Sequence, residues 1–213
     1  MDVVVAGGHG QIGLRLLTLL AEEGHRARGL IRNPDHAADL EAAGAEPVIC
    51  DMEAEDNLAG FVEDADAVVF AAGAGPGSGD ERKRTVDLGG AVKLIEAARK
   101  TGIARYVMLS AIGAPAMALQ PGPMQVYFAA KAEADAALEQ AGLDHTVVRP
   151  GGLTDDPGTG RVTAAPDLER GGQIPREDVA RVLAAVLATR STTGKTFDLV
   201  SGETPIDEAI GAL

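Results

Sequence analysis

A short apolar run that leads into regularly spaced glycines constrains this chain more than any other feature. The run is VVVA at residues 3–6, and Gly7, Gly10 and Gly13 follow it in the segment GGHGQIG. A β-strand favours such β-branched residues, and the glycines let the next turn approach a pyrophosphate that a Cβ atom would meet. The apolar stretch 14–20 is then expected to form a helix whose N-terminus faces the anion. The segment therefore predicts a dinucleotide site, although a tight turn without a ligand would look the same.

Apolar, strand-like segments alternate with amphipathic, helix-like segments along the rest of the chain. Such alternation predicts parallel βαβ units with right-handed crossovers, and hence a doubly wound α/β sheet. Asn33-Pro34 predicts a helix N-terminus, and Gly44 and Gly142 predict helix C-terminal stops. We expect strands at 2–6, 27–31, 46–50, 66–71, 104–110, 145–149 and 195–200, and helices at 11–23, 34–43, 81–102, 124–141, 177–189 and from about Pro205 onward.

The length of 213 residues and the 46% share of hydrophobic side chains are enough to bury a core without disulfides or metals. We therefore expect residues 1–213 to form a single domain. Three segments, 73–80, 114–126 and 151–175, are expected to be loops on the substrate side of the sheet, since ligands bind at the carboxyl ends of parallel strands. Met108, Met117, Met124, Val126 and Phe128 suggest an apolar pocket around the second loop, although the methionines could equally be core filler.

The charge and the residue types of the chain exclude several classes of function. A net charge of -13 repels nucleic acid and anionic lipid, and aromatic residues make up only 3% of the chain, so neither partner is expected. Cys50 follows an apolar run and is expected in the core, and the four histidines lack metal-ligand spacing, so no metal is expected. The chain opens as a strand, and no apolar run approaches 18 residues, which favours a cytoplasmic protein.

The residue at the end of the second strand predicts which dinucleotide is bound. Proteins that prefer NAD usually place a carboxylate about twenty residues beyond the glycine turn. This chain has Arg32-Asn33 there, and a guanidinium suits the 2'-phosphate of NADP, so NADP is favoured over NAD. A solvated arginine at a strand end is the alternative. Asp51-Met52 could flank the adenine, although Asp51 could equally cap the next helix.

Three residues carry the predicted chemistry. Tyr127 and Lys131 are four residues apart on a predicted helix, so the phenol and the ammonium share one helical face. The cation is expected to lower the pKa of Tyr127 toward neutrality, so that the phenol can exchange a proton with a carbonyl or an alcohol. Ser110, at a strand end, would hold the substrate oxygen, and Lys131 could also bind the nicotinamide ribose. An ordinary surface pair is the alternative, whereas a serine hydrolase is disfavoured because no G-x-S-x-G elbow exists.

Taken together, GGHGQIG at 7–13, AAG at 71–73, Ser110, YFAAK at 127–131 and VRPG at 148–151 resemble an atypical short-chain dehydrogenase/reductase of the NmrA-like branch. The resemblance implies a Rossmann sheet of seven strands in the order 3-2-1-4-5-6-7, with a small C-terminal substrate-side segment. It implies Ser110, Tyr127 and Lys131 as catalytic residues. The cofactor residues that we expect are Gly7, His9, Gly10, Gln11, Ile12, Gly13, Arg32, Asn33, Asp51, Met52, Ala71, Ala72, Gly73, Lys131 and Pro150.

One departure from the family pattern bears on function. Asp87 stands where the wider family often has an asparagine that completes a proton relay. The leading hypothesis is an NADP-dependent oxidoreductase that acts on a small carbonyl or alcohol substrate, as a monomer or a small homo-oligomer. The alternatives are an enzyme similar to sugar-nucleotide epimerases and dehydratases, and a non-catalytic NmrA-like sensor of NADP(H).

Overall fold

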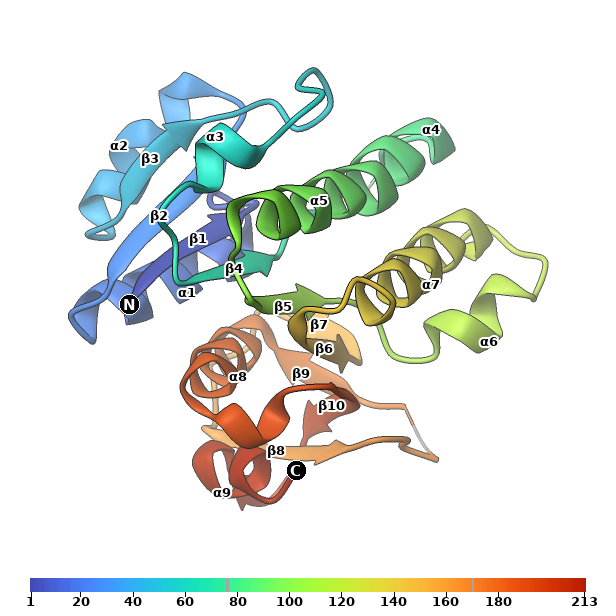
Figure 1. The fold of residues 1–213 in the computed structure, drawn as a ribbon. Helices are drawn as coiled ribbons and strands as arrows, with labels where there is room; N and C mark the ends of the chain where they lie inside the picture. The colour runs from blue at the N-terminus through green and yellow to red at the C-terminus, as the bar shows by residue number, and fades with distance from the viewer. Residues whose placement is uncertain (76, 170) are drawn as a thin grey trace.

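The computed structural model describes residues 1–75, 77–169 and 171–213, and a twisted sheet runs through its centre (Figure 1). The strand order is β11-β8-β10-β6-β5-β4-β1-β2-β3. The seven strands from β10 to β3 are parallel, which confirms the doubly wound fold and the predicted order 3-2-1-4-5-6-7. The bounds are β1 (Asp2–Ala6), β2 (Arg26–Ile31), β3 (Glu46–Ile49), β4 (Ala67–Phe70), β5 (Arg105–Leu109), β6 (Asp144–Pro150), β8 (Arg161–Ala165), β10 (Lys195–Ser201) and β11 (Thr204–Pro205).

The sheet extends beyond the seven strands that the sequence predicted. β8 pairs antiparallel with both β10 and β11, while β7 (Gly152–Thr154) and β9 (Gln173–Pro175) form a separate parallel pair. β7, β8 and β9 all lie within 151–175, which was predicted to be a loop. All three strands are short, and their buried apolar residues, such as Val162 and Ile174, are too few to show a period of two.

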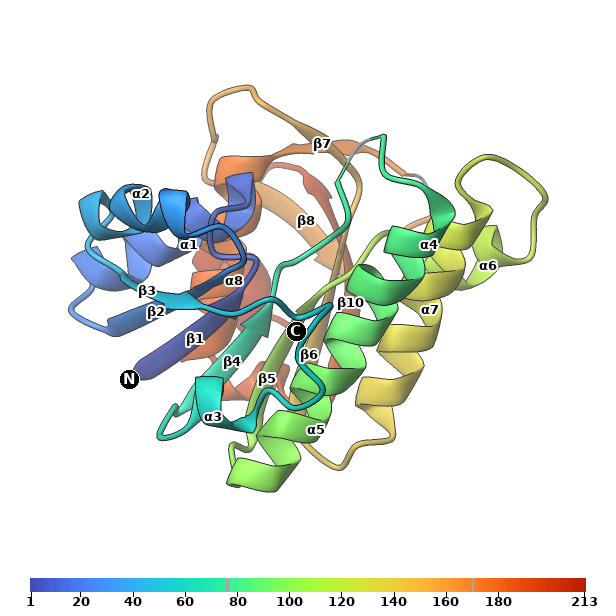
Figure 2. The same ribbon diagram turned by 90° about the horizontal axis from the view of Figure 1, so that it is seen from above.

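Helices cover both faces of the sheet, as the view from above shows (Figure 2). One layer contains α1 (Gln11–Glu22), α2 (Ala37–Ala42), α8 (Arg176–Ala188) and α9 (Ile206–Gly211), and the other contains α3 (Ala59–Val62), α5 (Ala91–Thr101) and α7 (Gln125–Glu139). The core therefore has two halves, one on each face of the sheet. Among the described residues, no helix combines the length and the apolar character that a membrane crossing needs.

The observed helices differ from the predicted ones in where they are interrupted and in their helix type. The segment predicted as one helix at 81–102 consists of α4 (Asp80–Arg82), a π-helical stretch (Lys83–Gly90) and α5. The helix predicted at 34–43 starts as a 3-10 turn, whose N-cap Asn33 accepts a hydrogen bond from the Asp35 amide as expected. A short helix, α6 (Ala114–Ala118), lies within the loop predicted at 114–126.

Candidate active site

The turn between β1 and α1 is as tight as its glycines suggested. Gly7 has a φ of 82°, and a Cβ atom on it would lie 2.7 Å from the Ala72 Cα. A Cβ atom on Gly13 would collide with the carbonyl oxygen of Gly7. Gly10 is the N-cap of α1, and no described side chain caps the first turn of this helix. The turn therefore presents backbone N–H groups at a helix N-terminus, which suits an anion such as a pyrophosphate.

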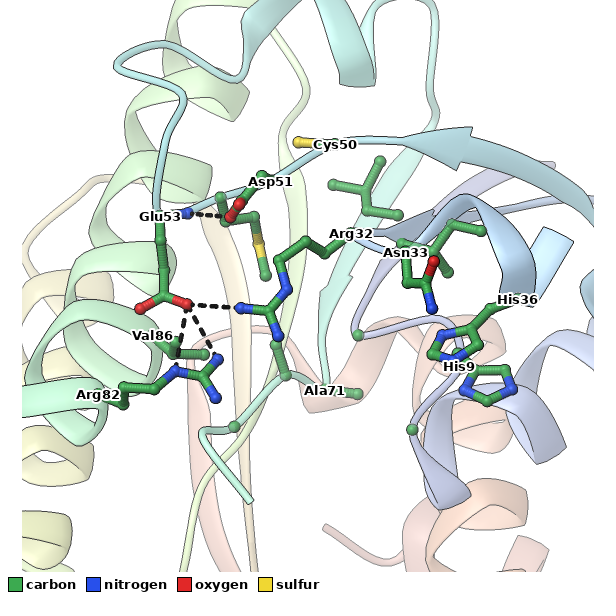
Figure 3. Close-up of a pocket in the computed structure, with 17 residues that line it drawn as sticks. His9, Arg32, Asn33, His36, Cys50, Asp51, Glu53, Ala71, Arg82 and Val86 are labelled. Carbon is green, nitrogen blue, oxygen red and sulfur yellow. Dashed lines mark hydrogen bonds and ion pairs between the residues drawn. The ribbon is translucent and has the colours of Figure 1, made fainter. Parts of the chain in front are cut away.

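A cleft of about 300 Å³ opens beside this turn, at the carboxyl ends of β1 to β4 (Figure 3). Its walls include many of the residues expected to hold a cofactor: Gly7, His9, Gly10, Arg32, Asn33, Asp51, Met52, Ala71, Ala72 and Gly73. The other expected residues lie outside its walls. Gln11 is exposed on α1, Ile12 and Gly13 are buried beneath the turn, Lys131 lies on α7, and Pro150 ends β6. The predicted loop 73–80 contains Pro76, and the loop 151–175 contains Arg170, both outside the described residues.

An ion-pair cluster at one end of the cleft was not predicted in full. Arg32 donates to the Glu53 carboxylate at 3.0 Å, and Arg82 donates to the same oxygen at 2.9 Å (Figure 3). Arg32 was predicted from its place after the second strand, whereas Glu53 and Arg82 were not, because no local pattern signals either of them. Asp51 accepts a hydrogen bond from the Glu53 amide at 3.0 Å, so it caps this turn while it also lines the cleft.

Two histidines lie on the other side of Arg32 (Figure 3). The rings of His9 and His36 stack with 3.6 Å between their centroids, and the His9 Nε2 lies 2.8 Å from an oxygen of Asp39. This arrangement fixes the side chain of His9, which belongs to the glycine turn. His36 lines the cleft but was not predicted as a site residue.

Tyr127 and Lys131 lie on the same side of α7. The Lys131 ammonium lies 6.0 Å from the centre of the Tyr127 ring and 5.6 Å from that of Phe70. The Lys131 side chain is only 5% exposed, and its Nζ donates to the Leu109 carbonyl at 3.2 Å. It also forms an ion pair with Asp87 at 3.4 Å. This buried amine therefore has a fixed position between α7, β5 and the π-helical stretch.

The predicted shift in the pKa of Tyr127 has the wrong sign. Burial, with a smaller contribution from the nearby carboxylates of Asp87 and Asp135, raises the pKa of Tyr127 to about 12. The prediction depended on the ammonium of Lys131 alone, without these two negative charges, one of which pairs with that ammonium. The phenol consequently keeps its proton at neutral pH.

Asp87 connects the cleft to this buried cluster. One of its oxygens accepts a hydrogen bond from the Ala74 amide at 3.0 Å, in the segment that follows β4. The other oxygen forms the ion pair with Lys131 and has no hydrogen-bond partner among the described residues. Asp87 therefore ties the wall of the cleft near Gly73 to Lys131.

Ser110 has a hydrogen-bond partner within the protein. Its buried hydroxyl donates to Asp135 at 2.9 Å, and Arg149 donates to the same carboxylate oxygen at 2.9 Å. Burial raises the pKa of Asp135, while Ser110 and Arg149 oppose that shift. The predicted contact of Ser110 with a substrate oxygen stays a prediction. Asp135, four residues after Lys131, was missed although its spacing placed it on the same face of the helix.

The remaining predictions concern metals, Cys50 and the methionines. No group of three or more His, Cys, Asp and Glu side chains among the described residues is arranged to hold a metal ion. Cys50 is buried as predicted, and burial raises its pKa to about 11, so it stays a thiol. Met108 is fully buried in the core, whereas Met117 and Met124 are 38% and 46% exposed, so the core-filler alternative holds for Met108 and is wrong for the other two.

Comparisons with known proteins also indicate a dinucleotide-binding protein. A family described as NAD(P)H-binding matches residues 7–190. A Bacillus subtilis protein named "uncharacterized sugar epimerase YhfK" is 43% identical, and the alignment covers 100% of both chains.

Two solved structures extend the comparison. A Bacillus halodurans protein that carries the name of an NAD-dependent epimerase/dehydratase has a TM-score of 0.95 at 37% identity, with 100% of both chains covered. The oxidoreductase ylbE from Lactococcus lactis has a TM-score of 0.87 at 27% identity, over 100% of this chain and 96% of that one. This chain therefore belongs to the NAD(P)H-binding family of Rossmann-fold oxidoreductases and epimerases, and within it to the atypical short-chain dehydrogenases/reductases.

Proposed function

We propose that the protein is an NADP-dependent oxidoreductase that reduces a small carbonyl compound, with Tyr127 as the proton donor. The observation that carries this proposal is the cluster of Tyr127, Lys131 and Asp87, which adjoins the wall of the dinucleotide cleft. When bound, the nicotinamide coenzyme supplies the hydride. The residues of the chain have to position the carbonyl and provide the proton.

The raised pKa of Tyr127 suits the reductive direction. Because burial and the nearby carboxylates hold this pKa at about 12, the phenol is protonated at pH 7 and can donate to a carbonyl oxygen as that oxygen gains negative charge. The carbonyl carbon gains the hydride, its oxygen gains the proton of Tyr127, and the phenolate then recovers a proton from solvent.

Lys131 and Asp87 support that proton transfer. A phenolate formed in a buried place is costly, and the ammonium of Lys131 would stabilise it at the moment when it forms. Asp87 holds Lys131 from the opposite side through their ion pair at 3.4 Å. The two residues would also pass the proton from solvent to Tyr127, in the role of the relay that the wider family often completes with asparagine.

The preference for NADP rests on the basic end of the cleft. Arg32 and Arg82 offer two guanidinium groups there, with side chains that are 55% and 41% exposed. A phosphate group can accept several charge-assisted hydrogen bonds from such planar donors. The glycine turn and the uncapped N-terminus of α1 would hold the pyrophosphate of the same molecule.

The decisive experiment is to measure NADPH oxidation at 340 nm with a panel of aldehydes and ketones. We expect turnover with at least one of them, and we expect Tyr127→Phe to lower it by about 10²- to 10⁴-fold, the usual contribution of a positioned acid. The substitution should leave the Kd for NADPH within about twofold, because the phenol has no part in binding the adenosine half. Unchanged turnover in Tyr127→Phe would refute the assigned role.

The names of two relatives favour a second candidate, an enzyme similar to sugar epimerases. Such an enzyme regenerates its coenzyme in place, so it would convert a sugar nucleotide with no net change at 340 nm. Incubating the protein with UDP-sugars and separating the products by chromatography tests this directly. Binding of NADPH without any turnover in either assay would instead favour the third alternative, a sensor of NADP(H).

A further inference from the structure

Three charged side chains from different parts of the chain meet at the basic end of the cleft (Figure 3). Arg32 follows β2, Glu53 follows β3, and Arg82 ends α4. One oxygen of Glu53 accepts from Arg32 at 3.0 Å and from Arg82 at 2.9 Å. Its other oxygen accepts from the hydroxyl of Thr85 at 2.7 Å. The carboxylate thus occupies the space between the two guanidinium groups.

The cluster is charged, and its members can be reached from the cleft. The hydrogen bond from Thr85 and the two arginines lower the pKa of Glu53, so the carboxylate is ionised at neutral pH. The Glu53 side chain is 26% exposed, and Arg32 and Arg82 are more exposed still. All three residues line the cleft. A ligand that enters from the cleft can therefore replace one partner of this cluster without unfolding any element.

The position of the cluster indicates which part of a bound dinucleotide lies beside it. This inference rests on the proposed function, in which the cleft binds NADP(H). A dinucleotide whose pyrophosphate lies at the β1–α1 turn brings its adenosine ribose to the carboxyl end of β2. In this protein that is the position of Arg32. The 2'-substituent of the ribose, a hydroxyl in NAD(H) and a phosphate in NADP(H), would then lie beside the carboxylate and the two guanidinium groups.

We propose that Glu53 determines coenzyme specificity by competing with the 2'-phosphate of NADP(H) for Arg32 and Arg82. NADP(H) binds when its phosphate displaces the carboxylate and accepts hydrogen bonds from both arginines. NAD(H) leaves the ion pairs in place, and its 2'-hydroxyl donates to Glu53. The arginines favour NADP(H), and the carboxylate favours NAD(H). Glu53 therefore makes the preference for NADP(H) smaller than it would be with Arg32 alone.

The test measures Kd values for NADPH and NADH by calorimetry, with 2',5'-ADP and 5'-AMP as minimal probes. Glu53→Gln removes the charge but keeps the length of the side chain, and we expect it to tighten NADPH and 2',5'-ADP by about tenfold. Binding of NADH should weaken or stay unchanged. Glu55→Gln is the matched control, because it removes the same charge two residues away, outside the walls of the cleft. It should change every Kd by less than about twofold.

Arg82→Gln tests the same idea in the opposite direction. It should weaken NADPH by about tenfold and leave NADH within about threefold, because it removes a partner of the phosphate. It also covers the case in which Glu53→Gln fails to fold, which circular dichroism would show. An NADPH to NADH affinity ratio that stays unchanged in either folded variant would overturn the inference and leave the cluster as a structural tie between β3 and α4.

These outcomes are separate from those that test the proposed function. The binding measurements need no substrate, so a shifted affinity ratio supports the role of Glu53 even if no carbonyl compound is ever reduced. Conversely, turnover with NADPH together with an unchanged NADPH to NADH affinity ratio in the variants contradicts only the role proposed for Glu53. If the wild-type protein binds neither coenzyme nor 2',5'-ADP, both proposals are wrong.

Discussion

At the scale of single residues, the environment of Tyr127 decides what it can do. The chain has two tyrosines and no tryptophan, so the absorbance of tyrosinate near 295 nm reports on few groups. Complete burial raises the pKa of Tyr106 well above its usual value, which leaves Tyr127, with a pKa of about 12, as the group that ionises first. Because the carboxylate of Asp87 contributes to that shift, Asp87→Asn should lower the pKa of Tyr127 by about one unit.

A spectroscopic pH titration of the folded protein checks this expectation. The control is Asp207→Asn, which makes the same charge change at an exposed position in the first turn of α9. It should leave the titration where it is in the wild type. Superimposable curves for Asp87→Asn and the wild type would mean that the carboxylate does not act on the phenol, and the roles proposed for Lys131 and Asp87 would have to change.

At the scale of elements, the β1–α1 turn makes the sharpest structural prediction. Gly13→Ala would place a Cβ atom against the carbonyl oxygen of Gly7, so the turn has to shift, and we expect a loss of about 1–3 kcal/mol in the free energy of unfolding. Gly60→Ala is the control, because nothing lies within 4 Å of the added Cβ and the residue belongs to α3. It should leave stability equal or improve it by up to about 1 kcal/mol. Urea denaturation of both variants measures the difference, and equal stabilities would show that the turn is looser than described.

Some of these elements could be predicted from local sequence patterns, and others could not. The glycine turn and the stop at Gly142 were predictable because each depends on a left-handed backbone conformation that few residues other than glycine adopt. The cap at Asn33 was predictable because few side chains can accept a hydrogen bond from the first turn of a helix. The π-helical stretch at 83–90 was not, since its residues have the same apolar spacing as an α-helix. That stretch nevertheless has functional consequences, because Thr85 on it contacts Glu53 while Asp87 contacts Lys131.

At the scale of the whole molecule, the order of the parallel strands followed from the alternation of strands and helices, together with the resemblance to a known family. The composition of the site did not follow in the same way. Arg32 could be predicted from its distance to the glycine turn, whereas Glu53 and Arg82 reach it only because β3 and α4 end at the same edge of the sheet. The negative charges around Tyr127 come likewise from packing between elements, which is why its pKa was predicted with the wrong sign.

The continuous sheet also predicts that the chain unfolds as one unit. The cleft is lined by residues 7–86, whereas both tyrosines lie beyond it, Tyr106 on β5 and Tyr127 on α7. A ligand of the cleft such as 2',5'-ADP, which rests on the proposed NADP site, should therefore stabilise a region that it does not touch. At 100 times its Kd it adds about 2.7 kcal/mol, or roughly 5–11 °C in Tm for a chain of this size. The Tm values measured by tyrosine fluorescence and by far-UV circular dichroism should both rise by that amount. A rise in the Tm from circular dichroism alone would mean that the two halves of the sheet unfold separately, because the ligand would then not stabilise β5 and α7.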